Sequence, residues 1–297
     1  MGDLRLGGRW TLVQRLRNDA WYGAIRVAHG WVRGWGAERL RRAGRVLGSV
    51  AYWVLPRWRG AVNRGLARAY SQAAPVGARE VFRGLGEDLG DAVAVWSGGE
   101  RAAEGLELDP GSERLLRAVH GRGRGVVFAT AHLGRMERMA AVVAELGMPV
   151  TTLARESYDP RLTSFYDTLR GTRGVRTIYR GRPGADRAVV SALRRGDLVG
   201  FPMDLAGRGM QCVRVQMLGT QRDLPVGPAR IALRTGASLV VGTPERVEGR
   251  MVLTVEEIGV EGEADGHALT QALANVLGRR ICSLPEHWPW MASGGTG

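Results

Sequence analysis

The fold is decided by one short stretch, Val126-Val-Phe-Ala-Thr-Ala-His132-Leu-Gly-Arg-Met-Glu137. Its first residues are apolar and predict a buried strand, and Gly134 predicts a turn after that strand. The apolar residues after the turn recur at helical spacing: Met136, Met139, Ala140 and Val143. In α/β proteins, side chains at the carboxyl end of a strand carry the chemistry. We therefore expect His132 in the turn, at that end of the strand.

Two acidic residues compete as the partner of His132. Glu137 follows it by five residues, which at 3.6 residues per turn places two helical side chains about 140° apart. The two therefore meet only if His132 precedes the helix. Asp204 ends another predicted strand and could instead reach His132 across the sheet edge. A carboxylate beside a neutral imidazole fixes its tautomer and stabilises the imidazolium, so either arrangement predicts a general base for a substrate hydroxyl. The alternative is a structural histidine near an unrelated surface glutamate, because an isolated H-x4-E is a weak signal.

The chain after residue 110 alternates between predicted strands and helices. Strands are predicted at 149–153, 175–179, 197–203, 238–242 and 251–255, besides the one ending near residue 131. Helices are predicted at 112–119, 160–169, 185–194, 228–235 and 267–279, besides the one running to residue 146. This alternation predicts an α/β fold with a mostly parallel central sheet flanked by helices.

The beginning of the chain has a different composition. Residues 1–70 hold 14 arginines against three acidic residues, and six of the nine tryptophans. Apolar residues recur at helical spacing from about 21 to 70, with breaks expected at Gly30, Gly34, Gly36 and Pro56, and another amphipathic helix is predicted at 76–96. We therefore divide the chain into a helical Arg/Trp-rich membrane-surface segment, 1–75, and an α/β domain, 76–297.

Arginine interleaved with tryptophan suits the headgroup region of an anionic membrane. No apolar run approaches the roughly 20 residues that span a bilayer. We expect a peripheral or monotopic protein on the cytoplasmic face of the inner (plasma) membrane. The alternatives are a nucleic-acid-binding arm or a solvated basic helix surface. No zinc-finger, RRM or KH signature is present, so we expect no nucleic-acid partner.

Several chemistries are excluded by residue usage. All 42 basic residues are arginines, so the chain has no P-loop, Schiff-base or kinase lysine. Cys212, Cys282 and the five histidines lack metal-ligand spacing, so we expect no metal and a reducing compartment. Ser164 and Ser191 lack a G-x-S-x-G setting, so we do not expect a serine hydrolase.

Several motifs, in order along the chain, resemble those of one family. They are residues 55–63, the H-x4-E of His132 and Glu137, Arg155, residues 196–204, Gly219 before 225–237, and residues 285–290. From about residue 48 to 290 the chain resembles the late lipid A biosynthesis acyltransferases of the lysophospholipid-acyltransferase-like superfamily. These include lauroyl/myristoyl transferases and phosphatidylinositol mannoside acyltransferases. One departure is Leu205, where the family usually has Gln, and it leaves the acceptor open.

The resemblance implies an O-acyltransferase that needs no cofactor. It would move a fatty acyl chain from acyl carrier protein or coenzyme A to a hydroxyl of a membrane (glyco)lipid such as a lipid A precursor. His132 would be the general base, with Glu137 and Asp204 both in the site. Arg170 would neutralise Glu137 and help bind phosphate, unless it only ends an exposed helix. Arg155 would bind a substrate phosphate or else form a surface ion pair.

Backbone N–H groups around Leu133 and Gly134 are the expected oxyanion donors, with no covalent acyl-enzyme. Other acceptors are possible: a phosphatidylinositol mannoside or another lysolipid. A non-enzymatic reading makes the chain a basic membrane- or nucleic-acid-binding protein in which His132 is structural.

Overall fold

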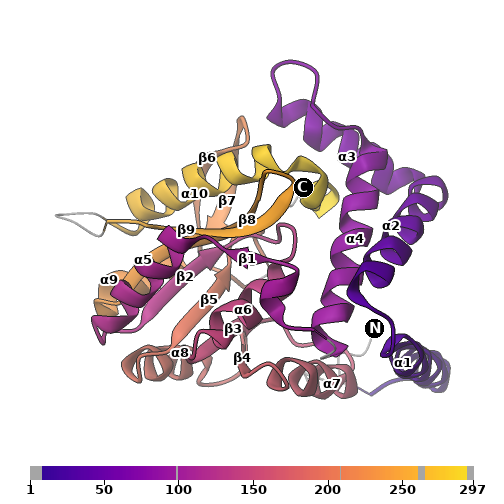
Figure 1. Cartoon of the computed structure of the whole chain (residues 1–297), viewed down its shortest axis with the longest axis horizontal. Coiled ribbons are helices and arrows are strands. Elements are labelled where there is room, and N and C mark those ends of the chain that lie inside the picture. Colours follow the sequence, from indigo (N-terminus) through magenta and orange to yellow (C-terminus); the bar gives the residue numbers. More distant parts are fainter. Residues whose placement is uncertain (1–8, 98–99, 208, 260–264, 293–297) are drawn as a thin grey trace.

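A seven-stranded sheet with helices packed against it forms the centre of the protein (Figure 1). The computed structural model describes residues 9–97, 100–207, 209–259 and 265–292. In sheet order the strands are β1 (Glu107–Leu108), β9 (Arg250–Glu257), β8 (Ser238–Val247), β2 (Val126–Thr130), β5 (Leu198–Pro202), β3 (Val150–Ala154) and β4 (Val175–Tyr179). Every neighbouring pair is parallel except β8 and β9. The predicted mostly parallel sheet is therefore confirmed.

The helices connect these strands and cover the sheet. They are α5 (Pro110–Gly121), α6 (Met136–Glu145), α7 (Pro160–Gly171), α8 (Ala185–Arg194), α9 (Gly227–Thr235) and α10 (Gly266–Ser283). Short 3₁₀ turns lie at η2 (Ala102–Glu104), η3 (Pro285–His287) and η4 (Trp290–Ala292). Each predicted helix of the α/β region is present, with ends shifted by a few residues.

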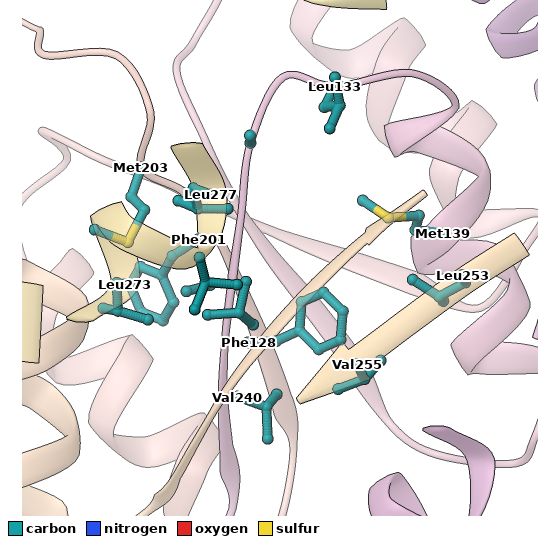
Figure 2. Close-up of a cluster of buried hydrophobic side chains, with 14 of the residues drawn as sticks. Phe128, Leu133, Met139, Phe201, Met203, Val240, Leu253, Val255, Leu273 and Leu277 are labelled. Carbon is teal, nitrogen blue, oxygen red and sulfur yellow. The ribbon is translucent and has the colours of Figure 1, made fainter. Parts of the chain in front are cut away.

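Strand β2 lies at the centre of the sheet because all five of its residues are apolar or small and buried. Phe128 lies in a cluster with Val240 and Val255 (Figure 2). Its ring occupies the space beside Gly242, where a Cβ atom would come within 2.0 Å of the ring. Phe201 pairs with the residue after Phe128 and so faces the other side of the sheet. The sheet is thus packed with apolar side chains on both faces, as in other parallel sheets.

One hairpin was not predicted. Strands β6 (Cys212–Met217) and β7 (Thr220–Pro225) form a separate antiparallel pair between the predicted strand at 197–203 and the predicted helix at 228–235. The turn that joins them has positive φ at both Leu218 and Gly219. Its first residue is a leucine, which is rare at positive φ, so the sequence lacks the Asn-Gly signature of a tight hairpin.

The N-terminal helices are α1 (Leu12–Val32), α2 (Ala37–Val54), α3 (Pro56–Ala69) and α4 (Ala78–Ser97). The breaks expected at Gly34, Gly36 and Pro56 are confirmed. The break expected at Gly30 is wrong, because one glycine inside a helix costs only about 1 kcal/mol and does not end it. None of the helices in the described ranges is both long and apolar enough to cross a bilayer.

Helices α2 and α4 pack backbone against backbone through glycines. A Cβ atom on Gly44 would lie 2.0 Å from the carbonyl oxygen of Gly86, and one on Gly48 would lie 2.0 Å from that of Phe82. Only glycine fits such a contact. Because α2 and α4 lie on opposite sides of residue 75, this contact joins the two segments that we divided there, and the division itself stays a prediction.

The substitution Gly44→Ala is therefore expected to destabilise the protein by about 1–3 kcal/mol, because the new methyl group meets backbone that cannot move aside alone. Gly30→Ala in α1 is the matched control, since a Cβ there has no atom within 4 Å. It should stabilise the protein by about 0.5–1 kcal/mol. Urea unfolding measures both, and equal midpoints for the two variants would contradict the packing argument.

Candidate active site

The register of β2 and β5 brings His132 and Asp204 together. Thr130 pairs with Pro202 at the ends of these parallel strands, and the Met203 N–H donates to the Thr130 carbonyl oxygen over 2.9 Å. His132 and Asp204 each follow two residues after that pair. Nδ1 of His132 lies 2.8 Å from Oδ1 of Asp204. Of the two acids that competed in the sequence, Asp204 is the one that contacts the imidazole.

The carboxylate of Asp204 is held on both oxygens. Its side chain is fully buried, and Oδ2 accepts a hydrogen bond of 2.8 Å from the indole Nε1 of Trp288. Trp288 is itself buried and comes from the segment after α10. A carboxylate bonded at both oxygens cannot rotate, so it holds the ring of His132 in one orientation.

The partners of His132 decide its tautomer. A carboxylate only accepts, so Nδ1 carries the proton and Nε2 keeps its lone pair. The side chain of His132 is 41% exposed, so a substrate can reach it. Burial lowers the pKa of His132, but the charge and hydrogen bond of Asp204 raise it, Glu137 raises it further, and Arg180 lowers it. The net result is a pKa above the ordinary histidine value.

Glu137 is engaged by Arg170 of α7. The guanidinium donates two hydrogen bonds to the carboxylate, from Nη2 to Oε1 over 2.6 Å and from Nε to Oε2 over 3.1 Å. The structure thus places Arg170 against Glu137, as the resemblance implies. Glu137 raises the pKa of His132 through its charge. Its carboxylate therefore belongs to the surroundings of the imidazole while its hydrogen bonds go to the arginine.

His132 and Glu137 line a cleft of about 220 Å³. Its walls come from α4, the β2–α6 loop and the η3 segment. The apolar part of the lining is Leu85, Leu89, Ala92, Met136 and Pro289. Among the described residues, no group of three or more His, Cys, Asp or Glu side chains could hold a metal ion.

A second histidine lines the same cleft and was not predicted. His287 is 3% exposed, and its Nδ1 lies 2.9 Å from Oδ2 of Asp88 on α4. Its Nε2 lies 3.2 Å from a guanidinium nitrogen of Arg246. Asp88 and His287 are 199 positions apart, so no local spacing connects them. The only signal was that His287 lies in the 285–290 motif.

The prediction of a free N–H donor at Gly134 is wrong, whereas a substrate-binding place for this residue stays a prediction. Its N–H, which we expected as an oxyanion donor, donates to the carbonyl oxygen of His287 over 3.0 Å. The positive φ of 54° at Gly134 turns the loop toward that segment. Gly134 lines the cleft, but its amide is already used in the structure.

Arg155 lies on the surface after β3. Its Nη2 donates to the Tyr158 hydroxyl over 3.1 Å, and its guanidinium stands 5.4 Å from the centre of that ring. The carboxylate of the next residue, Glu156, accepts from Nε of Arg182 over 2.9 Å.

Comparisons with known proteins fit this geometry. A family model described as bacterial lipid A biosynthesis acyltransferase matches residues 91–293. A phosphatidylinositol mannoside acyltransferase from Mycolicibacterium smegmatis is 27% identical over 173 residues. That match covers 56% of this chain and 55% of the relative, so the chain spans about half the relative's length. The residues matched by the family model include His132, Glu137, Arg170 and Asp204.

Proposed function

Because the chain belongs to the bacterial lipid A biosynthesis acyltransferase family, we propose that it is an O-acyltransferase acting on membrane lipids. It moves a fatty acyl chain from a thioester donor to a lipid hydroxyl. The observation that carries this proposal is the His132–Asp204 pair, 2.8 Å apart, beside a cleft with an apolar lining.

His132 acts as the general base in this proposal. Its Nε2 takes the proton of the acceptor hydroxyl while that oxygen attacks the thioester carbonyl carbon. The C–S bond then breaks, and the departing thiolate receives the proton from the imidazolium. Asp204 stabilises the imidazolium between these two events, and Trp288 keeps the carboxylate in place. Because the acceptor oxygen attacks the thioester directly, no covalent acyl-enzyme forms, and the proton ends on the departing thiol.

The lining of the cleft supports an acyl chain as its occupant, and the comparisons suggest two classes of acceptor. Leucine, alanine, methionine and proline line the cleft beside His132, and such a surface suits a hydrocarbon chain. The family favours a lipid A precursor as acceptor, and the relative from M. smegmatis favours a phosphatidylinositol mannoside. Either acceptor offers a hydroxyl, and either acyl carrier protein or coenzyme A supplies the thioester.

The N-terminal helices place the enzyme on the membrane in this proposal. Large apolar side chains of α1 to α3 are more than half exposed, among them Trp21, Val27, Trp31, Trp53 and Trp58. Arginines of the same helices supply positive charge for anionic headgroups. We therefore place the chain on the cytoplasmic face of the inner membrane as a peripheral protein.

Binding to phosphatidylglycerol vesicles is expected to weaken steeply between 0.1 and 1 M salt, because the Debye length falls from about 10 to about 3 Å. Trp31→Ala should weaken binding several-fold, since it removes an exposed indole from the interface. Val247→Ala, which changes an exposed apolar residue at the end of β8, is the control and should bind as the wild type does. Co-sedimentation measures all three. Equal binding to neutral phosphatidylcholine vesicles at every salt concentration would contradict the docking model.

The function itself is tested by incubating the purified protein with palmitoyl-coenzyme A or palmitoyl-acyl carrier protein and a lipid extract of the source organism. We expect mass spectrometry to find one lipid heavier by a single acyl group, with an equal amount of free thiol released. A deletion strain should lack the same acyl group. Thiol release without any acylated lipid would instead identify a thioesterase, and absence of both products would reject the proposal.

A further inference from the structure

Two arginines follow the paired ends of β3 and β4. Ala154 pairs with Tyr179, and the N–H of the next residue, Arg180, donates to the Ala154 carbonyl oxygen over 2.9 Å. Arg155 and Arg180 are therefore neighbours across the two strands, whose axes lie about 4.8 Å apart. They lie on the same rim of the sheet as His132, because all the strands involved are parallel.

Arg180 extends toward the loop that carries Asp204. A Cβ atom on Gly207 would lie 2.9 Å from both Nη1 and Nη2 of Arg180, so the guanidinium packs against bare backbone there. Its charge is also close enough to lower the pKa of His132. The guanidinium of Arg180 is thus close both to Arg155 and to the loop that carries Asp204.

The charge of this arginine pair is not balanced within the described part of the chain. No acidic side chain there forms an ion pair with Arg180, whereas nearby Arg170 and Arg182 pair with Glu137 and Glu156. Burial and then the charge of Arg155 lower the pKa of Arg180. Two like charges side by side, one of them half-buried, are stabilised by a bound anion.

We propose that Arg155 and Arg180 together bind a phosphate group carried by one of the two substrates. This rests on the proposed function. Two guanidiniums can each offer a fork of N–H donors to phosphate oxygens, which a lone arginine does less well. The phosphate comes from one of two sources: the phosphopantetheine arm of the thioester donor or the headgroup of the lipid acceptor. In either case it positions a substrate beside His132.

Binding of inorganic phosphate, measured by calorimetry at fixed ionic strength, tests the site without any acyl transfer. We expect Arg180→Gln to weaken phosphate binding at least tenfold. Arg182→Gln is the matched control, because it removes the same charge two residues away, from a guanidinium that already pairs with Glu156. It should bind phosphate within twofold of the wild type.

Arg155→Gln guards against a folding defect in the Arg180 variant. The Arg155 side chain is on the surface, so its loss leaves the fold intact and should still weaken phosphate binding severalfold. Equal phosphate affinity of the Arg180→Gln and Arg182→Gln proteins, both folded by circular dichroism, would overturn the proposal.

Two pairs of soluble probes identify the source of the phosphate. Tighter binding of 4′-phosphopantetheine than of pantetheine, lost in Arg180→Gln, assigns the site to the donor. Tighter binding of glycerophosphoinositol than of inositol, lost in the same variant, assigns it to the acceptor. If neither phosphate ester binds more tightly than its phosphate-free counterpart, the pair is not a substrate site, even in a protein that transfers acyl groups. Conversely, the protein could be inactive in acyl transfer and still bind a phosphate ester more tightly than its phosphate-free counterpart. That result would reject the proposed function but support the phosphate site.

Discussion

Replacing His132 with Gln is expected to lower kcat for acyl transfer by roughly 10²–10⁴-fold, the usual contribution of a general base. Glutamine keeps a similar volume and can still donate to Asp204, so the loop and the buried carboxylate retain a partner. It cannot accept and release a proton near neutral pH. The loss should therefore appear in kcat, while vesicle binding and the unfolding midpoint stay close to those of the wild type.

His267→Gln is the matched control for that measurement. His267 is exposed at the start of α10, its Nε2 contacts a backbone carbonyl oxygen, and it does not line the cleft beside His132. Its kcat should stay within about twofold of the wild type, well below the effect of removing a general base. Wild-type kcat in a folded His132→Gln protein would remove the imidazole from the mechanism and favour the structural reading of this residue.

Replacing Asp204 with Asn is expected to lower kcat by roughly 10²–10³-fold through the tautomer of His132. Trp288 donates to one oxygen of residue 204, so the amide of Asn must turn its carbonyl toward the indole and its NH₂ toward the imidazole. Nδ1 of His132 then has to accept, which puts the proton on Nε2 and removes the lone pair that the reaction needs.

The pH profile of kcat/KM gives an independent readout of Asp204. In the proposed mechanism the imidazole acts only when it is neutral, so we expect activity to be lost as pH falls through the pKa of His132, which Asp204 holds above the ordinary value. Without that carboxylate, burial and Arg180 lower the pKa. The residual activity of the Asn variant should therefore persist to lower pH than in the wild type. An unchanged midpoint would exclude Asp204 as the source of the raised pKa.

Asp223→Asn is the control for the loss of one negative charge. Asp223 forms an exposed ion pair with Arg214 on the β6–β7 hairpin, over 3.1 Å. Such surface pairs contribute about 0–1 kcal/mol, so both kcat and the pH midpoint should match those of the wild type.

The sequence was sufficient wherever one local pattern decided the structure. The buried run at β2 and the turn at Gly134 predicted a histidine at the end of a strand, and parallel strands predicted that Asp204 could reach it. The choice between Glu137 and Asp204 needed the register of β2 and β5, which no local pattern contains. The contact between His287 and Asp88 could not be predicted from the sequence either, because the two residues lie far apart in the chain.

The failures have physical causes as well. The N–H of Gly134 was predicted as an oxyanion donor because helix starts offer unpaired amides. Here the carbonyl oxygen of His287, which lies far away in the chain, already accepts from that N–H. Arg180 belongs to none of the sequence motifs. We assign it a binding role only because it lies beside Arg155 and because no acidic side chain of the described residues pairs with it.

The glycine contact between α2 and α4 has a mechanical consequence. Helices in touch along their backbones cannot slide or tilt independently, and α4 supplies one wall of the cleft. If the chain docks on a membrane through α1 to α3, as we propose, the depth of α2 in the bilayer also sets the height of the cleft above the lipid headgroups. That height would then decide which hydroxyls of an acceptor come within reach of the imidazole.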